Sequence, residues 1–238
     1  MRRLSPATMW RTPALRREAA FVGLPLLVFL GLLVIVTRAA PTGFDREVGG
    51  ALQSIPWGPL HIVPAAGSDI GGGVYGTYLF PAMLGTFVAA RRQWRWLVPL
   101  AAVFALHYVA ISPKAFVTAY RPSPEFGVYG AGGMESFPSG HVQWAASFYG
   151  LLAYMAWRAW GTSRRNRVAI IGAWAAVVAM TMLGRIELGR HWPIDTMAGV
   201  LAGLITLRAL VALHGLIERR WPASDTPLAE AGSTAALA

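Results

Sequence analysis

Six long apolar segments constrain the fold of this chain more than any other feature of its sequence. A helix needs roughly 20 mainly apolar residues to cross a lipid bilayer, and each segment reaches or approaches that length. The expected spans are Ala19–Val36, Gly73–Ala90, Trp96–Ile111, Val142–Trp160, Val168–Leu183 and Ile194–Leu213. The sequence therefore predicts an all-α, polytopic membrane protein, built as a bundle of six transmembrane helices.

The first apolar segment is interpreted as an uncleaved span rather than a secretory signal. It is longer than the apolar region of a signal peptide, which has about 7–15 residues. We expect three parts along the chain: a cytoplasmic N-terminal arm (1–18), the transmembrane domain (19–215) and a cytoplasmic, disordered tail (216–238). Residues 44–55 suit either a short amphipathic helix on the outer interface or a plain loop.

Arginine clusters set the expected orientation. They occur in the N-terminal arm and at residues 91–95, 161–167 and 218–220, which lie on one side if all six segments span. The positive-inside rule makes that side cytoplasmic. The net charge of +10 is typical of nucleic-acid binding, but the basic residues fall in clusters between apolar runs, so no nucleic-acid partner is expected. The expected location is the inner (cytoplasmic) membrane, which the chain crosses several times. The chain has no cysteine, which excludes disulfides and thiolate chemistry.

The opposite, non-cytoplasmic side carries a second group of cations, against the topology rule. They are Lys114, which is the only lysine of the chain, Arg121, Arg185 and Arg190. Any one of them is explained by a side chain that extends to lipid headgroups. Three cations close to two histidines and a helix start, all on one face, instead favour an anionic ligand.

Two segments on this side are suited to binding phosphate. Lys114 and Arg121 are seven residues apart, close to two helical turns, so both can face one ligand. In "PSGH", Ser139 is a favoured N-cap and Gly140 allows close approach of the backbone, so the amides of the first turn can bind an anion. His141 can donate a proton to a leaving group there. Taken alone, the four residues of "PSGH" are better explained as an ordinary capped helix.

The segment "GRIELGRHWPID" supplies a candidate nucleophile. His191 and Asp195 are four residues apart, and Pro193 marks a helix start between them. A carboxylate that accepts one ring N–H of a histidine fixes the tautomer and leaves the other nitrogen basic. Arg185 adds a third cation. The alternative is a polar cluster that only stabilises the ends of two helices.

These residues together define a mechanism of phosphoryl transfer that needs neither metal nor cofactor. The phosphoryl group lies between the three cations and the amides at Ser139–Gly140. His191 attacks phosphorus, His141 protonates the departing alcohol, and water then cleaves the phosphohistidine with His141 as base. The cations stabilise charge on the equatorial oxygens, which is the main task in phosphoryl transfer. No cluster has the spacing of a metal site.

The three motifs resemble those of the type 2 phosphatidic acid phosphatase family of integral-membrane lipid phosphatases. The family pattern K-x6-RP, PSGH and SR-x5-H-x3-D is matched by Lys114…Arg121-Pro122, Pro138–His141 and Gly184-Arg185…His191…Asp195. The resemblance covers roughly residues 71–213 and implies six transmembrane helices, with the active site facing the periplasm or the exterior. It implies His191 as nucleophile, Asp195 as its partner and His141 as acid. It further implies the phosphate ligands Lys114, Arg121, Ser139, Gly140 and Arg185.

One position departs from the family pattern. Gly184 replaces the serine that precedes the arginine of the third motif. If that hydroxyl normally bonds the phosphate or a neighbouring arginine, the pocket of this chain is slightly weaker or wetter. We expect the activity to survive.

The resemblance implies a hydrolase whose partners are membrane lipids and a lipid phosphate or diphosphate. Candidate substrates are undecaprenyl diphosphate, phosphatidylglycerol phosphate and phosphatidic acid. Two alternatives stay open: a phosphotransferase in which a lipid hydroxyl intercepts the phosphohistidine, and a non-catalytic binder or transporter of lipid phosphates. Vanadium haloperoxidases share the motifs but are soluble, so six spans argue against them. One sequence selects neither the lipid nor the oligomeric state.

Overall fold

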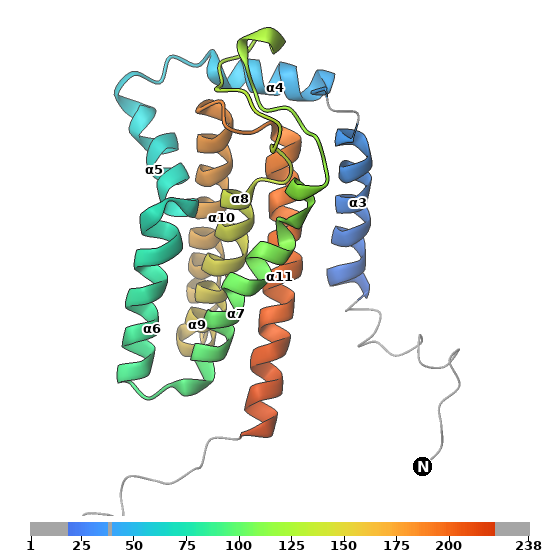
Figure 1. Ribbon diagram of the computed structural model, residues 1–238. Helices are drawn as coiled ribbons and strands as arrows, with labels where there is room; N and C mark the ends of the chain where they lie inside the picture. The colour runs from blue at the N-terminus through green and yellow to red at the C-terminus, as the bar shows by residue number, and fades with distance from the viewer. Residues whose placement is uncertain (1–18, 38–39, 222–238) are drawn as a thin grey trace, which may run out of the picture.

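The computed structural model describes residues 19–37 and 40–221; within these ranges the regular secondary structure is helical, the helices are joined by turns and loops, and there is one isolated bridge (Figure 1). The α-helices are α3 (Leu24–Val36), α4 (Gly43–Gln53), α5 (Ile62–Gly72), α6 (Phe80–Ala90), α7 (Trp94–Ala110), α8 (Gly140–Trp144), α9 (Gly150–Trp160), α10 (Arg164–Glu187) and α11 (Pro193–Arg220). Short turns are η1 (Ala19–Gly23), η2 (Gly58–His61), η3 (Tyr75–Leu79), η4 (Ser112–Ala115), η5 (Pro124–Phe126) and η6 (Ala145–Tyr149). The expected arm (1–18) and residues 222–238 of the expected tail lie outside the described residues.

All six apolar segments are helical, and four helices are long and apolar enough to cross a membrane. These four are Gly58–Ala90, Trp94–Ala115, Arg164–Glu187 and Pro193–Arg220. The helix Ala20–Val36 is apolar but shorter. The helix Gly140–Trp160 is not among the four; its sequence includes His141, Gln143 and Arg158, which lower its mean hydropathy. An all-helical membrane protein is thus confirmed.

Two helix boundaries differ from the prediction. The second candidate span begins at Gly58 rather than Gly73, because an additional helix, α5, precedes the break at Gly73. Gly67 and Gly71 of α5 pack against α10, so a sequence that resembles a loop forms a helix. The last helix, α11, continues to Arg220, five residues past the expected domain boundary at 215.

Helix α4 resolves the open alternative for residues 44–55 in favour of a helix. Thr42 caps it: the Asp45 amide donates to Oγ1 of Thr42 at 3.1 Å, and the Thr42 amide donates to Oδ2 of Asp45 at 3.2 Å. The other carboxylate oxygen, Oδ1, accepts from the amide of Ile194 at 3.0 Å. Figure 1 shows α4 lying across one end of the bundle. A buried carboxylate therefore fastens this crossing helix to the first turn of α11.

Close contact between α5 and α10 comes from residues without side chains. A Cβ atom at Gly67 would lie 2.5 Å from the carbonyl oxygen of Met180, and one at Gly184 would overlap the carbonyl oxygen of Pro64. Thr181 Oγ1 donates to the Gly67 carbonyl at 3.0 Å across this contact. Small residues let helix backbones approach in lipid, where no hydrophobic effect drives helix association. The contact fixes the position of Arg185, the next residue of α10.

The continuous helix formed by α8, η6 and α9 lies at the centre of the bundle. Every residue from Val142 to Phe148 is buried. Helix α11 packs on it through Gly199 and Gly203, where a Cβ atom would lie 2.7 Å from the carbonyl oxygens of Ser139 and Gln143, respectively. The start of this central helix, which carries the PSGH motif, is therefore enclosed by protein.

The two ends of the bundle differ in character. Helix α4 and the long segment between α7 and α8 cover one end, as Figure 1 shows. The α6–α7 turn and the C-terminal end of α11 lie at the other end in the same view. The second end holds the arginines of the 91–95 cluster and of residues 219–220.

Candidate active site

A cavity of about 530 Å³ lies at the end of the bundle that α4 covers. Its walls come from the α5–η3 junction, α7, the segment after α7, the start of α8, and the α10–α11 region. Six of the predicted site residues line it: Lys114, Arg121, Gly140, His141, Arg185 and His191. The other two, Ser139 and Asp195, are buried at 0% and 1% exposure. Three motifs that are far apart in the sequence thus meet at one cavity.

Carbonyl oxygens hold the two cations of the first motif. Lys114 Nζ donates to the carbonyls of Glu135 at 2.7 Å and Ser136 at 3.2 Å. Arg121 donates through Nη2 to the Glu135 carbonyl at 2.9 Å and through Nη1 to the Arg190 carbonyl at 2.7 Å. An ammonium has three N–H groups, so one remains for a ligand of the cavity.

Backbone hydrogen bonds hold the segment that carries these cations. The Arg121 amide donates to the Gly133 carbonyl at 2.8 Å, and the Ser136 amide donates to the Ala119 carbonyl at 3.1 Å. The first motif is therefore fixed against the residues that precede PSGH, and its cations are oriented before any ligand binds.

Arg185 receives its hydroxyl partner from α5 rather than from its own motif. Its Nη1 donates to Ser68 Oγ at 3.0 Å, while its Nε is buried without a hydrogen-bond partner. At the preceding position a serine has no room, because the α5 backbone contacts Gly184 directly. Ser68 thus supplies to Arg185 the kind of hydroxyl that the family pattern carries at 184.

His191 and Asp195 lie together, with a separation slightly beyond a hydrogen bond. Nδ1 of His191 is 3.5 Å from Oδ2 of Asp195, and it has no hydrogen-bond partner among the described residues. The same carboxylate oxygen accepts from the Trp192 amide at 2.9 Å and from the Ser136 hydroxyl. Asp195 is therefore held rigidly beside the ring, and a small closure would complete the expected pair.

Burial controls the protonation of His191. The side chain is 3% exposed, and burial, together with the positive charges of Lys114, Arg185 and Arg121, lowers the pKa of His191 well below the usual histidine value. The ring is therefore neutral at physiological pH, which is the state that the predicted role as nucleophile requires.

In the PSGH motif, one expected phosphate donor, the backbone N–H of Ser139, is not available to a ligand. The backbone N–H of Ser139, expected among the phosphate donors, donates to the Asp195 carbonyl at 3.0 Å and is not free. The Ser139 hydroxyl is buried without a hydrogen-bond partner, so it is the group of this residue that a ligand can use. Gly140 occupies the first position of the central helix, where amides lack intrahelical partners.

His141 is positioned by α5. A Cβ atom at Gly72 would lie 2.7 Å from Cγ of His141, so only glycine allows this helix end to lie against the ring. His141 faces the same cavity as His191.

Four polar residues near the site were missed in the sequence. Ser136 and Ser68 bond to Asp195 and Arg185, Asp45 holds the first turn of α11, and His107 of α7 lines the cavity. Only His107 had a usable signal, because it lies seven residues before Lys114 and thus on the same helix face. Within the described residues, no three His, Cys, Asp or Glu side chains gather as metal ligands.

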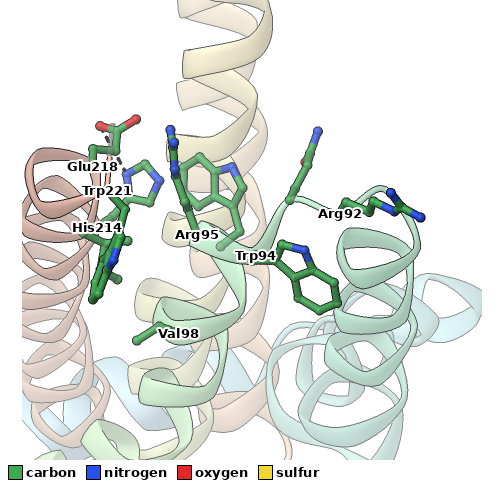
Figure 2. A pocket seen from close by; sticks show the side chains of 10 residues that line it. Arg92, Trp94, Arg95, Val98, His214, Glu218 and Trp221 are labelled. Carbon is green, nitrogen blue, oxygen red and sulfur yellow. Dashed lines mark ion pairs between the residues drawn. The ribbon is translucent and has the colours of Figure 1, made fainter. Parts of the chain in front are cut away.

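A larger cavity, of about 690 Å³, lies at the opposite end of the bundle. Figure 2 shows His214 and Glu218 of α11 on one side of it and Arg95 and Trp94 of α7 on the other. The Glu218 carboxylate is engaged by Arg158 through bonds of 2.8 and 2.9 Å, and His214 stacks on Trp96 with ring centroids 3.7 Å apart. Because these groups are already paired, we place the candidate active site at the cavity around His191.

Comparison with known proteins gives consistent matches. The family model described as the PAP2 superfamily matches residues 96–219. The fold is similar to that of a transmembrane PAP2-type phosphatidylglycerolphosphate phosphatase from Bacillus subtilis, with a TM-score of 0.66 and 20% identity, over 82% of this chain and 98% of that one. It is also similar to LpxE from Aquifex aeolicus, with a TM-score of 0.55 and 21% identity, over 72% and 96% of the two chains.

One curated relative matches at the sequence level. YbjG of Escherichia coli (strain K12), named as a candidate undecaprenyl-diphosphatase, is 38% identical over 72 residues. The match spans 30% of this chain and 31% of that protein, which is less than a third of either length.

Proposed function

Because the chain belongs to the PAP2 superfamily, we propose that it is a metal-independent membrane phosphatase that hydrolyses a lipid phosphate or diphosphate at the cavity around His191. One observation carries the proposal: the three cations, the two histidines and Gly140 of the three motifs line a single cavity. Three positive side chains can neutralise the negative charge on a phosphoryl group while it is transferred.

The reaction proceeds in two steps. His191, neutral and directed by Asp195, attacks phosphorus, while His141 protonates the leaving oxygen of the lipid. Water then attacks the phosphohistidine with His141 as general base, and the P–N bond breaks. Lys114, Arg121 and Arg185 hold the equatorial oxygens in both steps.

The Ser139 hydroxyl and the amide of Gly140 complete the phosphate site. The hydroxyl and the Nε of Arg185 are both buried without partners, which costs free energy unless a ligand satisfies them. A phosphate oxygen accepts from both kinds of donor.

The proposal includes a topology. Six helices cross the inner membrane, with the arginine-rich end in the cytoplasm and the cavity facing the periplasm or exterior. Its support is the concentration of arginine at the end opposite α4, which the positive-inside rule assigns to the cytoplasm. The arm (1–18) and the tail lie on that cytoplasmic side.

The relatives suggest the first substrates to try. One is named for undecaprenyl diphosphate and another for phosphatidylglycerolphosphate. Phosphate release from these two lipids and from phosphatidic acid, by wild type and His191→Ala side by side, tests the function. We expect wild type to release phosphate from at least one lipid and His191→Ala to lose at least about 1000-fold.

Three results would contradict this function or replace it. Normal turnover by His191→Ala excludes the nucleophile. Labelled phosphate that appears on an added acceptor lipid, without free phosphate, indicates a phosphotransferase. Headgroup binding without turnover by wild type indicates a binder or transporter.

A further inference from the structure

A third histidine lines the cavity and belongs to none of the three motifs. His107 lies on α7, two helical turns before Lys114, and both face the same cavity. Its Cε1 atom is 3.7 Å from the position that a Cβ atom would take at Gly140. His107 therefore borders the start of the central helix, beside His141.

A chain of hydrogen bonds fixes which nitrogen of His107 carries its hydrogen. Gln143, which is 0% exposed, donates through Nε2 to the hydroxyls of Thr206 at 3.2 Å and Ser147 at 3.4 Å. Those hydroxyls donate in turn to carbonyls, of Ala202 at 2.9 Å and Trp144 at 3.4 Å, so they accept from Gln143. The amide nitrogen of Gln143 is thereby committed to them.

The amide oxygen of Gln143 must consequently face His107. This oxygen pairs with Nδ1 of His107 and can only accept a hydrogen bond. Nδ1 therefore carries the hydrogen, and Nε2 of the neutral ring has a free lone pair. No hydrogen bond to Nε2 occurs within residues 19–37 and 40–221.

Such a network is costly inside a membrane domain. Gln143, Ser147 and Thr206 are polar and buried between apolar helices, where polar groups usually mark a functional site. A bridge between α7 and α8 needs no free nitrogen at the cavity. The network instead delivers a hydrogen-bond acceptor to the side of the cavity where His141 lies.

We propose that His107 is a further catalytic residue, which binds the hydrolytic water in the second step. This inference rests on the proposed phosphohistidine mechanism. Water has two hydrogens: one bonds to His141, the general base, and the other to Nε2 of His107. The water oxygen attacks phosphorus, the P–N bond breaks, and its electron pair returns to the ring nitrogen of His191. His141 takes the proton, and His107 gains none.

The proposal makes a sharp distinction between water and an alcohol. An alcohol has a single O–H hydrogen, which His141 accepts, so its attack on the phosphohistidine does not need His107. Removal of His107 should therefore slow hydrolysis much more than transfer to an added alcohol such as glycerol.

The variant for the test is His107→Phe combined with Gln143→Leu. It removes the acceptor without leaving a buried amide unpaired, and the hydroxyls of Ser147 and Thr206 keep their carbonyl partners. Gln143→Leu alone keeps His107 but no longer fixes the hydrogen on its Nδ1 atom. We therefore expect hydrolysis to slow by less than in the double variant. Melting temperature in detergent shows that each variant is folded.

The readout is the fate of ³²P from a labelled lipid phosphate, quenched in alkali to preserve phosphohistidine. For the double variant we expect the rate of phosphoenzyme formation to stay within about twofold of wild type. The rate of phosphoenzyme hydrolysis should fall by about 10–100-fold. Phosphoenzyme should then accumulate. The ratio of glycerol phosphate to free phosphate should rise by about 10-fold or more.

Equal slowing of both steps, or an unchanged ratio of transfer to hydrolysis, would overturn the role of His107 and leave it a structural bridge. Failure of wild type to release phosphate from every lipid of the panel would overturn the proposed function and the role of His107 together. The two failures are distinguished by the wild-type enzyme alone.

Discussion

Among single residues, Lys114 shows that the shape of a cation matters at this site as well as its charge. Its ammonium lies between the carbonyls of Glu135 and Ser136, at 2.7 and 3.2 Å. A guanidinium is planar and larger, and it offers its N–H groups in a fixed fork. The only lysine in a chain that otherwise uses arginine therefore stands where a compact donor is needed.

We expect Lys114→Arg to lower turnover by about 10-fold or more, since the fork cannot occupy the space between two carbonyls and still reach the phosphate. Melting temperature should stay close to that of wild type. Arg165→Lys, an exposed exchange on α10 at the arginine-rich end, is the matched control and should leave turnover unchanged. Full activity in Lys114→Arg would make Lys114 a general charge anchor.

His191 makes stability depend on pH in a defined direction. Its pKa is lowered in the folded protein by burial, whereas in the unfolded chain it is about 6.5. The unfolded state therefore binds more protons below that pH. Neutral His191 therefore makes its full contribution to the free energy of unfolding above about pH 6.5, and this contribution is lost as the pH falls below that value.

The melting temperature measured between about pH 8 and pH 5 tests this sign. Wild type should lose stability toward acid pH, and His191→Gln, which cannot be protonated, should lose less over the same interval. Parallel curves for the two proteins would show that His191 is not held neutral by the fold.

Site residues that belong to a motif of fixed spacing could be predicted from the sequence. Residues that reach the site only through tertiary contacts could not. The spacing of Lys114, His141 and His191 identified the cavity. Ser68 touches Arg185 across 117 positions, and Asp45 touches Ile194 across 149. Such contacts depend on how helices rotate against each other, which no local pattern specifies.

At the scale of helices, glycine decides how closely α5 and α10 approach. The apolar runs predicted most helices, because length and hydropathy are enough in lipid. Helix α5 was missed because its sequence "AAGSDIGG" contains three glycines and two polar residues within eight positions. Those glycines weaken an isolated helix but allow the contact with α10, so tertiary packing overrides propensity.

Gly184→Ala tests this contact. The new Cβ would overlap the Pro64 carbonyl, and overpacking against a rigid backbone costs about 3 kcal/mol or more. We expect the melting temperature to fall by roughly 6–12 °C. On the same helix, Gly172 has nothing within 4 Å of a Cβ position, so Gly172→Ala is the control and should be neutral or slightly stabilising. An equally mild effect at both positions would contradict the close approach.

For the whole molecule, the consequential feature is that the two ends carry different cavities and different charges. The cavity around His191 is lined by residues of the segment between α7 and α8, toward the end that α4 crosses, and the cavity around His214 lies at the arginine-rich end. A membrane that separates the two ends would give the site access to one compartment only. The proposed orientation rests on the charge asymmetry between the two ends and is open to direct measurement.

The absence of cysteine makes that measurement simple, since any introduced thiol is unique. We expect Glu125→Cys, exposed near the active-site end, to react with a membrane-impermeant maleimide in intact cells. Thr162→Cys, exposed in the α9–α10 turn, should react only after permeabilisation. The reverse pattern would invert the proposed topology.

Helix α11, the last of the described helices, has a consequence for the order in which the enzyme matures. The Ser139 amide finds its partner, the carbonyl of Asp195, on α11, and Gln143 adds a bond to Thr206 of α11 to those that it makes with Ser147 and His107. During synthesis the central helix enters the membrane first, and the Ser139 amide is without this partner until α11 follows, a costly state in hydrocarbon. Insertion of α11 supplies the missing partner and, at the same time, brings His191 to the cavity. Under the proposed mechanism no catalytic site exists before α11 is made, and a nascent chain that stalls before α11 should not attack the lipids around it.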